Sequence, residues 1–297
     1  MHKNTQTGLV ISAHGRQYRV ELPDGQILPC VPRGKKSEVV CGDRVRIALT
    51  SADQGVIEAI EPRTHLLHRS NEFREKLIAA NVDQILVVCA TEPAFSDDLL
   101  NRCLIAASSQ NMSALIILNK ADLTEKLPAA RERLAYLNDL GFPVLALNAK
   151  EHAETLRPWL SGKTSVLVGQ SGMGKSTIIN ALLPEAAAAT REISTALDTG
   201  KHTTTHATLY HLDPDSHLID SPGLQEFGLG HLDQHDLMAA FPELQDHLGK
   251  CRFRNCLHDQ EPGCALLTAV ETGHIHPIRF SIFQTLLANL GYPLDRR

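Results

Sequence analysis

The stretch that decides the fold runs from Ser165 to Leu183 and reads SVLVGQSGMGKSTIINALL. Apolar and β-branched residues lead into Gly169, and the segment from Gly169 to Ser176 matches the pattern G-x-x-x-x-G-K-[ST]. Apolar residues at helical spacing follow at once. Such a loop holds phosphates when it joins a strand to a helix N-terminus, because backbone N–H groups and the positive end of the helix dipole then point at them. The stretch therefore predicts a strand, a phosphate-binding loop and a helix.

Two side chains of this loop have expected roles with a nucleotide. The Lys175 ammonium would reach the β- and γ-phosphates, and the Ser176 hydroxyl would bind Mg²⁺. A glycine-rich turn without a ligand is the alternative, and it is disfavoured because the strand, the loop, the lysine, the hydroxyl and the helix all agree. We expect the nucleotide to be bound by the following residues: Gly169, Gln170, Ser171, Gly172, Met173, Gly174, Lys175, Ser176 and Thr177.

The composition is that of an ordinary globular protein. The chain has 297 residues, enough for two or three domains, and a formal net charge of −5. This charge gives no general attraction to nucleic acid, so any RNA contact must come from local patches, and no DNA partner is expected. The N-terminal residues lack a signal-peptide pattern, and no apolar run reaches the length of a membrane span. We expect a cytoplasmic protein with no membrane partner, acting as a monomer.

Residues 1–63 are expected to form a small β-barrel. Short runs alternate apolar with polar residues, as half-buried antiparallel strands do, and turn signals such as Pro23-Asp24-Gly25 separate them. Five such strands suggest a closed barrel like the oligonucleotide-binding (OB) fold. The basic loop Arg33-Gly34-Lys35-Lys36 is either a solvated loop or a contact to a phosphate backbone, and the sequence leaves both open.

Residues 64–228 are expected to form an α/β domain, because strands alternate with helices there. Continuous apolar strands are predicted at 83–89, 114–118 and 143–147. Polar residues follow the second and third strands, as Asn119-Lys120-Ala121-Asp122 and Asn148-Ala149-Lys150. In open α/β sheets ligands bind at the carboxyl ends of the strands, so both segments are well placed to contact a ligand.

The segment Asn119-Lys120-Ala121-Asp122 predicts guanine specificity. The Asp122 carboxylate can accept hydrogen bonds from N1–H and the 2-amino group of guanine, a pair of donors that adenine does not offer. The Lys120 stem can lie over the base, and Asn119 can tie neighbouring loops together. Alone the tetrapeptide would be a weak signal, but beside a phosphate loop it is a strong one. The pair Ala149-Lys150 resembles the backbone clip on the guanine O6 of guanine-nucleotide proteins.

Two segments after the phosphate loop are predicted to contact Mg²⁺ and the γ-phosphate. In the polar run GKHTTT, Thr204 can supply a second hydroxyl to Mg²⁺. Asp220, which follows a predicted strand, suits a water-mediated Mg²⁺ contact, and Gly223 suits an N–H donated to the γ-phosphate. A plain Pro-Gly turn is the alternative for this second segment, DSPG. Its place one strand after a threonine-rich loop argues against that alternative.

Residues 229–297 are expected to form a mostly helical zinc-binding domain. Cys251, Cys256, His258 and Cys264 offer three thiolates and one imidazole, which can complete a closed tetrahedral Zn²⁺ site of the structural kind. The chain has seven cysteines, and those outside this cluster are scattered. Cations and an aromatic residue flank the site in the run Lys250 to Arg254, either as an RNA contact or as a solvated face.

The order of these motifs resembles that of the circularly permuted GTPases, in which the guanine-specificity segments precede the phosphate loop. With an N-terminal barrel and a C-x₄-C-x-H-x₅-C tail added, the whole chain resembles the ribosome small-subunit-dependent GTPase A family of bacteria. This resemblance implies a late assembly factor that binds the 30S subunit and its 16S rRNA. It also implies hydrolysis of GTP to GDP and phosphate, stimulated by the subunit and followed by release, with Mg²⁺ at the nucleotide and one structural Zn²⁺.

The sequence also predicts slow hydrolysis in isolation. Many GTPases place a water-orienting glutamine directly after the glycine that corresponds to Gly223. Leu224 occupies that position here, and its side chain cannot orient water. His231 is a candidate for that role, and a solvated histidine is the equal alternative. A second hypothesis is a GTP-dependent RNA-binding switch in which hydrolysis is incidental. A third, an ATPase, is disfavoured by Asp122.

Overall fold

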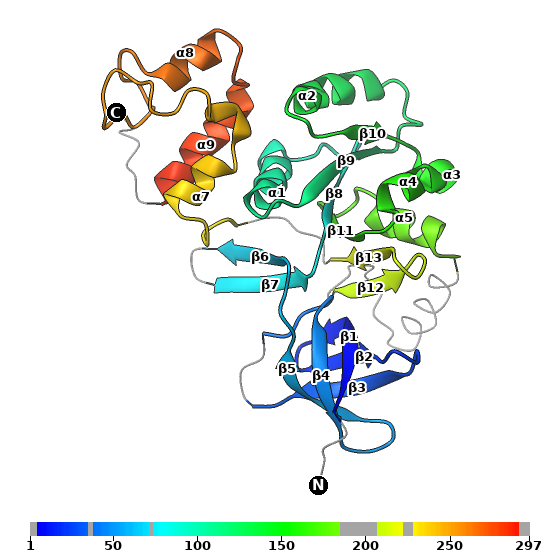
Figure 1. Cartoon of the computed structure of the whole chain (residues 1–297). Helices are drawn as coiled ribbons and strands as arrows, with labels where there is room; N and C mark the ends of the chain where they lie inside the picture. Colours follow the sequence, from blue (N-terminus) through cyan, green and yellow to red (C-terminus); the bar gives the residue numbers. More distant parts are fainter. Residues whose placement is uncertain (1–4, 35–37, 72–73, 185–206, 222–227, 291–297) are drawn as a thin grey trace.

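The computed structural model describes residues 5–34, 38–71, 74–184, 207–221 and 228–290. Within them the chain forms a β-barrel, a larger α/β unit and a C-terminal group of helices (Figure 1). The barrel lies below the α/β unit in this view, and the C-terminal helices lie beside the α/β unit at the upper left (Figure 1). In these ranges no helix has both the length and the apolar character needed to cross a bilayer.

The barrel confirms the five strands expected near the N-terminus. Strand β1 pairs with both β2 and β4, and β5 lies between β3 and β4, so the strands form a closed ring. Alternate residues such as Val20, Leu28 and Ile47 are buried in a core of the barrel's own. The strand bounds are β1 Thr5–His14, β2 Gln17–Glu21, β3 Ile27–Pro32, β4 Arg44–Leu49 and β5 Gly55–Ile60.

The barrel is continuous with the α/β unit, which the sequence did not predict. Ser12 in β1 pairs with Thr208 in β12 (Thr208–His211), so barrel and α/β strands join in one 11-stranded sheet. At the exit from the barrel, the fully buried carboxylate of Asp43 accepts from Nε of Arg63 at 2.7 Å. A buried carboxylate needs such partners, so this pair helps to fix the chain where it leaves the barrel.

A hairpin between the barrel and the α/β unit was also missed. Strands β6 (Leu66–Asn71) and β7 (Arg74–Ala80) pair antiparallel as a separate two-stranded sheet. The run reads LLHRSNEFREKLIAA and has no clean alternation of apolar and polar residues, so periodicity gave no signal for strands.

The α/β unit contains the parallel sheet that the sequence predicted. Its strand order is β10-β9-β8-β11-β13, all parallel, with β12 antiparallel beside β13. Helices α1 and α2 lie on one side of the sheet and α3 to α5 on the other, as right-handed crossovers require (Figure 1). The strands are β8 Gln84–Ala90, β9 Ser113–Asn119, β10 Val144–Ala146, β11 Thr164–Val168 and β13 His217–Asp220. The helices are α1 Asp97–Ser109, α2 Leu127–Asp139, α3 Ala149–His152, α4 Arg157–Leu160 and α5 Lys175–Leu182, with a 3₁₀ turn η1 at Ala153–Leu156.

The C-terminal helices pack on the α/β unit and share its core. Phe241 and Phe283 belong to the same buried cluster as Leu100 and Leu104 of α1. A long loop between Leu244 and Ala265 carries the cysteines of the predicted zinc site. These elements are α7 Gln234–Ala239, the 3₁₀ turn η2 Pro242–Leu244, α8 Ala265–Glu271 and α9 Pro277–Asn289.

Candidate nucleotide site

The predicted phosphate loop joins β11 to α5, and its backbone requires glycine at two positions. Gly169 has φ +150°, and a Cβ there would lie 2.4 Å from the carbonyl oxygen of Val88. Gly174 has φ +99°, and a Cβ there would lie 2.1 Å from Nδ2 of Asn119. Both contacts are far too short for any side chain, so the motif glycines allow the loop to pass close to its neighbours. The second contact also brings Asn119 directly against the phosphate loop.

Asn119 holds three loops together. Its Nδ2 donates to the carbonyl oxygen of Met173 in the phosphate loop at 3.0 Å, and its Oδ1 accepts from the N–H of Ala149 at 3.0 Å. The side chain is buried, with 3% of the residue exposed. These bonds confirm the expectation that Asn119 ties neighbouring loops together.

A cavity of about 270 Å³ lies where these loops meet. Five of its lining residues were predicted from sequence to bind the nucleotide, although they come from three separate segments. Leu123 and Asn148 were not assigned to the site: a leucine carries no polar signature, and Asn148 was noted only as the start of its segment. Its Oδ1 caps α3 by accepting from the N–H of Lys150 at 3.1 Å. The full lining is Asn119, Lys120, Asp122, Leu123, Asn148, Lys150 and Thr177.

The loop after β8 supports one wall of this cavity and was missed by the sequence analysis. Lys120, which has φ +59°, donates from Nζ to the carbonyl oxygen of Glu92 at 2.7 Å. The hydroxyl of Thr91 donates to the carbonyl oxygen of Lys120 at 3.0 Å. The Glu92 carboxylate in turn pairs with Lys126 at the start of α2. These contacts hold the Lys120 backbone and stem in one arrangement beside Asp122.

Lys175 is buried at the end of the phosphate loop. Its Nζ donates to the carbonyl oxygens of Gly169 at 2.7 Å and Gln170 at 3.0 Å. Burial lowers the pKa of this ammonium, and the negative charge of Asp220 acts in the opposite direction. The side chain therefore lies within the loop as a partly desolvated cation, which strengthens its attraction for a phosphate.

The segment after β13 lies against the strand that leads into the phosphate loop. Asp220 pairs in register with Leu167 of β11 and is 6% exposed. The hydroxyl of Ser221 donates to the carbonyl oxygen of Leu167 at 2.5 Å. Thr204 and Gly223, the other predicted contacts to Mg²⁺ and the γ-phosphate, lie outside the described residues, as does Leu224.

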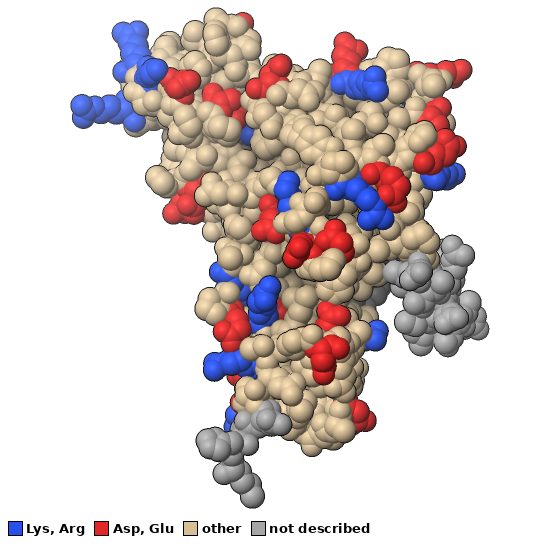
Figure 2. Space-filling model, turned by 45° about the vertical axis from the view of Figure 1, so that its right-hand side comes forward, with Lys and Arg blue, Asp and Glu red and all other residues tan. Residues whose placement is uncertain are grey.

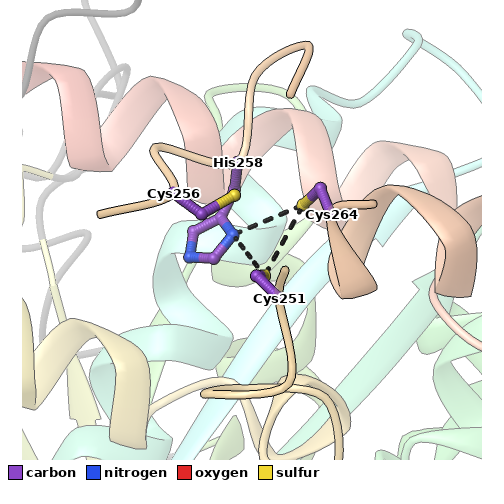
Figure 3. A group of neighbouring side chains, drawn as sticks. All are labelled: Cys251, Cys256, His258 and Cys264. Atoms are coloured by element: carbon purple, nitrogen blue, oxygen red, sulfur yellow. Dashed lines mark hydrogen bonds between the residues drawn. The ribbon is translucent and has the colours of Figure 1, made fainter. Parts of the chain in front are cut away.

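The four predicted zinc ligands converge in the C-terminal loop (Figure 3). Nδ1 of His258 lies 3.5 Å from Sγ of Cys251 and 3.5 Å from Sγ of Cys264, and these two sulfurs are 3.9 Å apart. One ligand atom from each of the four residues, Cys256 included, lies within 4.8 Å of every other. Tetrahedral zinc, with Zn–S about 2.3 Å and Zn–N about 2.0–2.1 Å, requires sulfurs about 3.8 Å apart and sulfur–nitrogen separations of about 3.6 Å. The donor set and its spacing fit one zinc ion.

Further contacts hold this loop in shape. The Glu261 carboxylate accepts from the N–H groups of Leu257 at 2.6 Å and Asp259 at 2.9 Å. Nε2 of Gln284, in α9, donates to the carbonyl oxygen of His258 at 2.8 Å. The ligand-bearing loop is therefore attached to the last helix of the described chain.

His231 lies beside the hairpin that the sequence missed. Its ring stacks on that of His68 in β6, with 4.9 Å between the centroids and 24° between the planes. This contact joins the start of the C-terminal part to the β6–β7 hairpin. The expected role of His231 in positioning water stays a prediction.

Comparison with known proteins agrees with this geometry. Residues 60–230 match the family model described as RsgA GTPase. The small ribosomal subunit biogenesis GTPase RsgA of Bordetella pertussis is 53% identical over 291 residues, 97% of each chain. The protein of that name in Burkholderia pseudomallei is 54% identical over 285 residues, 94% of this chain and 91% of the relative.

Two solved structures share the fold. YjeQ from Thermotoga maritima matches with a TM-score of 0.72 and 29% identity, over 99% of this chain and 100% of that one. YloQ, described as a circularly permuted GTPase, matches with a TM-score of 0.68 and 25% identity, over 98% and 96% of the two chains.

The lining of the cavity predicts the effect of Asp122→Asn. An amide in place of the carboxylate can donate to the 2-oxo group of xanthine but cannot accept from both N1–H and the 2-amino group of guanine. We expect affinity for GDP to fall and affinity for xanthosine diphosphate to rise, each by about 10-fold or more, since a polar group that the bound base covers and leaves unpaired costs about 1–3 kcal/mol. Competition of both nucleotides for a bound fluorescent analogue measures the change. Unchanged preference for guanine would contradict the assignment of Asp122.

Proposed function

Because the chain belongs to the RsgA GTPase family, we propose that it acts on the small ribosomal subunit late in assembly, hydrolysing GTP to GDP and phosphate. The chain is a GTP hydrolase. The observation that carries the nucleotide assignment is the cavity beside the phosphate loop, lined by residues of both guanine-specificity segments. The relatives' names support the small subunit as the partner. Bacterial ribosomes are assembled in the cytoplasm, so the proposed function implies a cytoplasmic location.

Each residue of the site has a proposed task in this reaction. Asp122 and Lys120 bind the base, and Ala149 and Lys150 contact its O6 side. The phosphate-loop N–H groups and Lys175 hold the phosphates and offset the charge that develops during phosphoryl transfer. The hydroxyls of Ser176 and Thr204 would hold Mg²⁺ directly, and Asp220 would hold it through water; the ion would supply positive charge against the phosphates. The N–H of Gly223 would donate to the γ-phosphate.

We propose that hydrolysis is slow until the ribosomal partner binds and completes the active site. The site lacks a water-orienting glutamine where Leu224 stands. A partner that completes such a site can raise turnover by about 10³- to 10⁵-fold, as activating proteins do for other GTPases. Turnover on the subunit would then drive release of the GDP-bound chain.

RNA contact is proposed at the tip of the C-terminal loop. Lys250, Arg252, Phe253 and Arg254 are exposed there, and the Arg252 guanidinium lies 5.5 Å from the centroid of the Phe253 ring. Lys and Arg side chains project from the outer end of this part of the molecule, whereas both signs of charge are interspersed over the rest of that face (Figure 2). Cations beside an exposed ring suit a phosphate backbone and an unstacked base.

GTP turnover with and without purified 30S subunits tests the proposal, with 50S subunits as the control. We expect 30S subunits to raise the turnover rate at least 10-fold and 50S subunits to leave it unchanged. Absence of stimulation, or equal stimulation by 50S, would contradict a small-subunit partner. A chain that binds 30S in a GTP-dependent way and leaves without hydrolysis would instead support the RNA-binding switch.

The variant His231→Ala tests whether His231 positions the attacking water, in the same assay and with 30S binding measured separately. If His231 positions water, stimulated turnover falls at least about 10-fold while binding is kept, since general acid–base groups contribute about 10²–10⁴-fold. His235→Ala, four residues further along the chain and exposed, serves as the control. Wild-type turnover by His231→Ala would remove this residue from the mechanism.

We also propose one structural Zn²⁺ at Cys251, Cys256, His258 and Cys264. Metal analysis of the purified chain should find about one zinc per chain, and Cys256→Ser should lose most of it because a three-ligand site binds zinc more weakly. Cys30→Ala, which removes a buried thiol from the barrel, should keep the metal. A wild-type chain without zinc, or a Cys256→Ser chain with full zinc content, would refute this site.

A further inference from the structure

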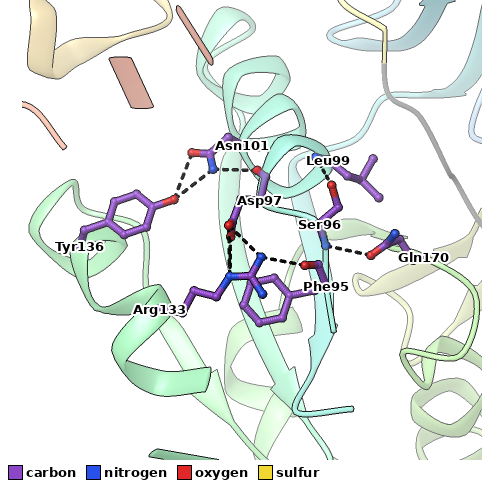
Figure 4. A network of polar contacts seen from close by, with 8 residues as sticks. All are labelled: Phe95, Ser96, Asp97, Leu99, Asn101, Arg133, Tyr136 and Gln170. Atoms are coloured by element: carbon purple, nitrogen blue, oxygen red, sulfur yellow. Dashed lines mark hydrogen bonds and ion pairs between the residues drawn. The ribbon is translucent and has the colours of Figure 1, made fainter. Parts of the chain in front are cut away.

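A line of partly buried polar contacts begins at the phosphate loop and enters helix α1. Oε1 of Gln170 accepts from the N–H of Ser96 at 2.9 Å (Figure 4). Ser96 is the N-cap of α1, and its hydroxyl oxygen accepts from the N–H of Leu99 at 3.2 Å. Gln170 is also the residue whose carbonyl oxygen accepts from Nζ of Lys175. The first turn of α1 is therefore fastened to a residue that contacts the phosphate-binding lysine.

The same helix holds a buried amide one turn further along. Asn101 is fully buried, and its Nδ2 donates to the carbonyl oxygen of Asp97 at 2.8 Å and to the Tyr136 hydroxyl of α2 at 3.0 Å (Figure 4). Its Oδ1 accepts from Nη1 of Arg279 in α9 at 3.2 Å. Asn101 is thus the point where α1, α2 and the C-terminal part meet through hydrogen bonds.

Arg279 is a buried charge whose partners come from two parts of the molecule. The side chain is 0% exposed and pairs through Nε with Oε1 of Glu243 at 2.5 Å. Its guanidinium lies 4.4 Å from the centroid of the Phe241 ring. Glu243 and Phe241 belong to the C-terminal part, whereas Asn101 belongs to α1. A buried guanidinium is costly unless its hydrogen-bond partners are all in place. Arg279 therefore favours one position of the C-terminal part relative to α1.

Helix α9 continues the connection to the cysteine-rich loop. Gln284 lies five residues after Arg279 on α9, and its Nε2 donates to the carbonyl oxygen of His258. One helix therefore binds α1 through Arg279 and the metal-binding loop through Gln284. Near the start of α9, the ring of His276 stacks on that of Tyr136 at 4.0 Å, so the helix also contacts α2.

We propose that Asn101 and Arg279 are positioning residues that couple the position of the C-terminal part on α1 to the geometry of the phosphate loop. A displacement of the cysteine-rich loop (residues 251–264) moves α9 and changes the Arg279–Asn101 contact. That change reaches Gln170 through the first turn of α1. Linkage makes the coupling free energy reciprocal, so a nucleotide that repositions Gln170 also shifts the conformational equilibrium of the cysteine-rich loop. The inference rests on the proposed nucleotide site but not on the proposed ribosomal partner.

Amide hydrogen exchange of the full chain, without ribosomes, tests this coupling in three states: free, with Mg²⁺ and GDP, and with Mg²⁺ and a non-hydrolysable GTP analogue. Asn101→Ala removes the hydrogen bond between Asn101 of α1 and Arg279 of α9 but leaves the Arg279–Glu243 pair in place. Arg279→Lys is a second variant that keeps a charge for Glu243 but is too short and too narrow to reach Asn101 as well. The matched control is Arg102→Gln, which breaks only the pair of Arg102 with Asp98 on α1.

In the wild type and in Arg102→Gln, we expect nucleotide to slow exchange in peptides of 251–264 and 277–289 by about 5-fold or more, the lower end of typical allosteric coupling. In Asn101→Ala and Arg279→Lys, nucleotide should still slow exchange in the phosphate loop, but it should no longer slow exchange in 251–264 and 277–289. The ratio of affinities for GDP and the GTP analogue should shift as well, which a purely structural role would not require.

Two results would overturn the inference. The first is a wild-type chain whose phosphate loop is protected by nucleotide while 251–264 and 277–289 exchange at an unchanged rate. The second is a full distant response in Asn101→Ala, or in Arg279→Lys should Asn101→Ala fail to fold. Loss of phosphate-loop protection in the wild type would instead refute the nucleotide site itself, and the coupling with it.

Discussion

The site depends on the two hydrogen bonds of the Asn119 side chain. A buried amide can donate to one loop and accept from another at the same time, and Asn119 does so between Met173 and Ala149. Gly174 has no side chain at the one point where a side chain would displace this amide. The guanine-specificity segments precede the phosphate loop in the chain, but this order is immaterial because these bonds join the loops in space.

Both flanking parts attach to elements that border the nucleotide loops. The barrel pairs with β12, whose partner strand β13 ends at Asp220. Across the same junction, Nε2 of His211 in β12 lies 2.7 Å from the carboxylate of Glu21 in the barrel. On the other side the C-terminal helices rest on α1, the helix that Gln170 holds at its first turn. A displacement of the barrel can therefore reach the nucleotide site through β12 and β13, and a displacement of the C-terminal helices can reach it through α1.

Local chemistry explains what could be predicted from the sequence. Gly174 and Asp122 belong to motifs whose function requires one residue type at one spacing, and the barrel strands alternate with the period of the pleat. The β6–β7 hairpin, the pairing of Ser12 with Thr208 and the contact of Asn101 with Arg279 lack such signals. The hairpin is local, but its strands have no alternation of apolar and polar residues. The other two contacts join residues far apart in sequence and form only when the folded surfaces meet, so an asparagine inside an apolar helix gave no indication of its partner.

The most direct test of this account is the affinity of Asn119→Ala for GDP, measured by calorimetry with Mg²⁺ present. Loss of two hydrogen bonds worth about 1–1.5 kcal/mol each should weaken binding about 100-fold while far-UV circular dichroism stays unchanged. Asn138→Ala, which truncates an exposed asparagine of α2, should bind GDP like the wild type. An Asn119→Ala chain that binds GDP within about 3-fold of the wild type, a difference under about 1 kcal/mol, would show that the loops do not depend on this side chain, and would contradict the account.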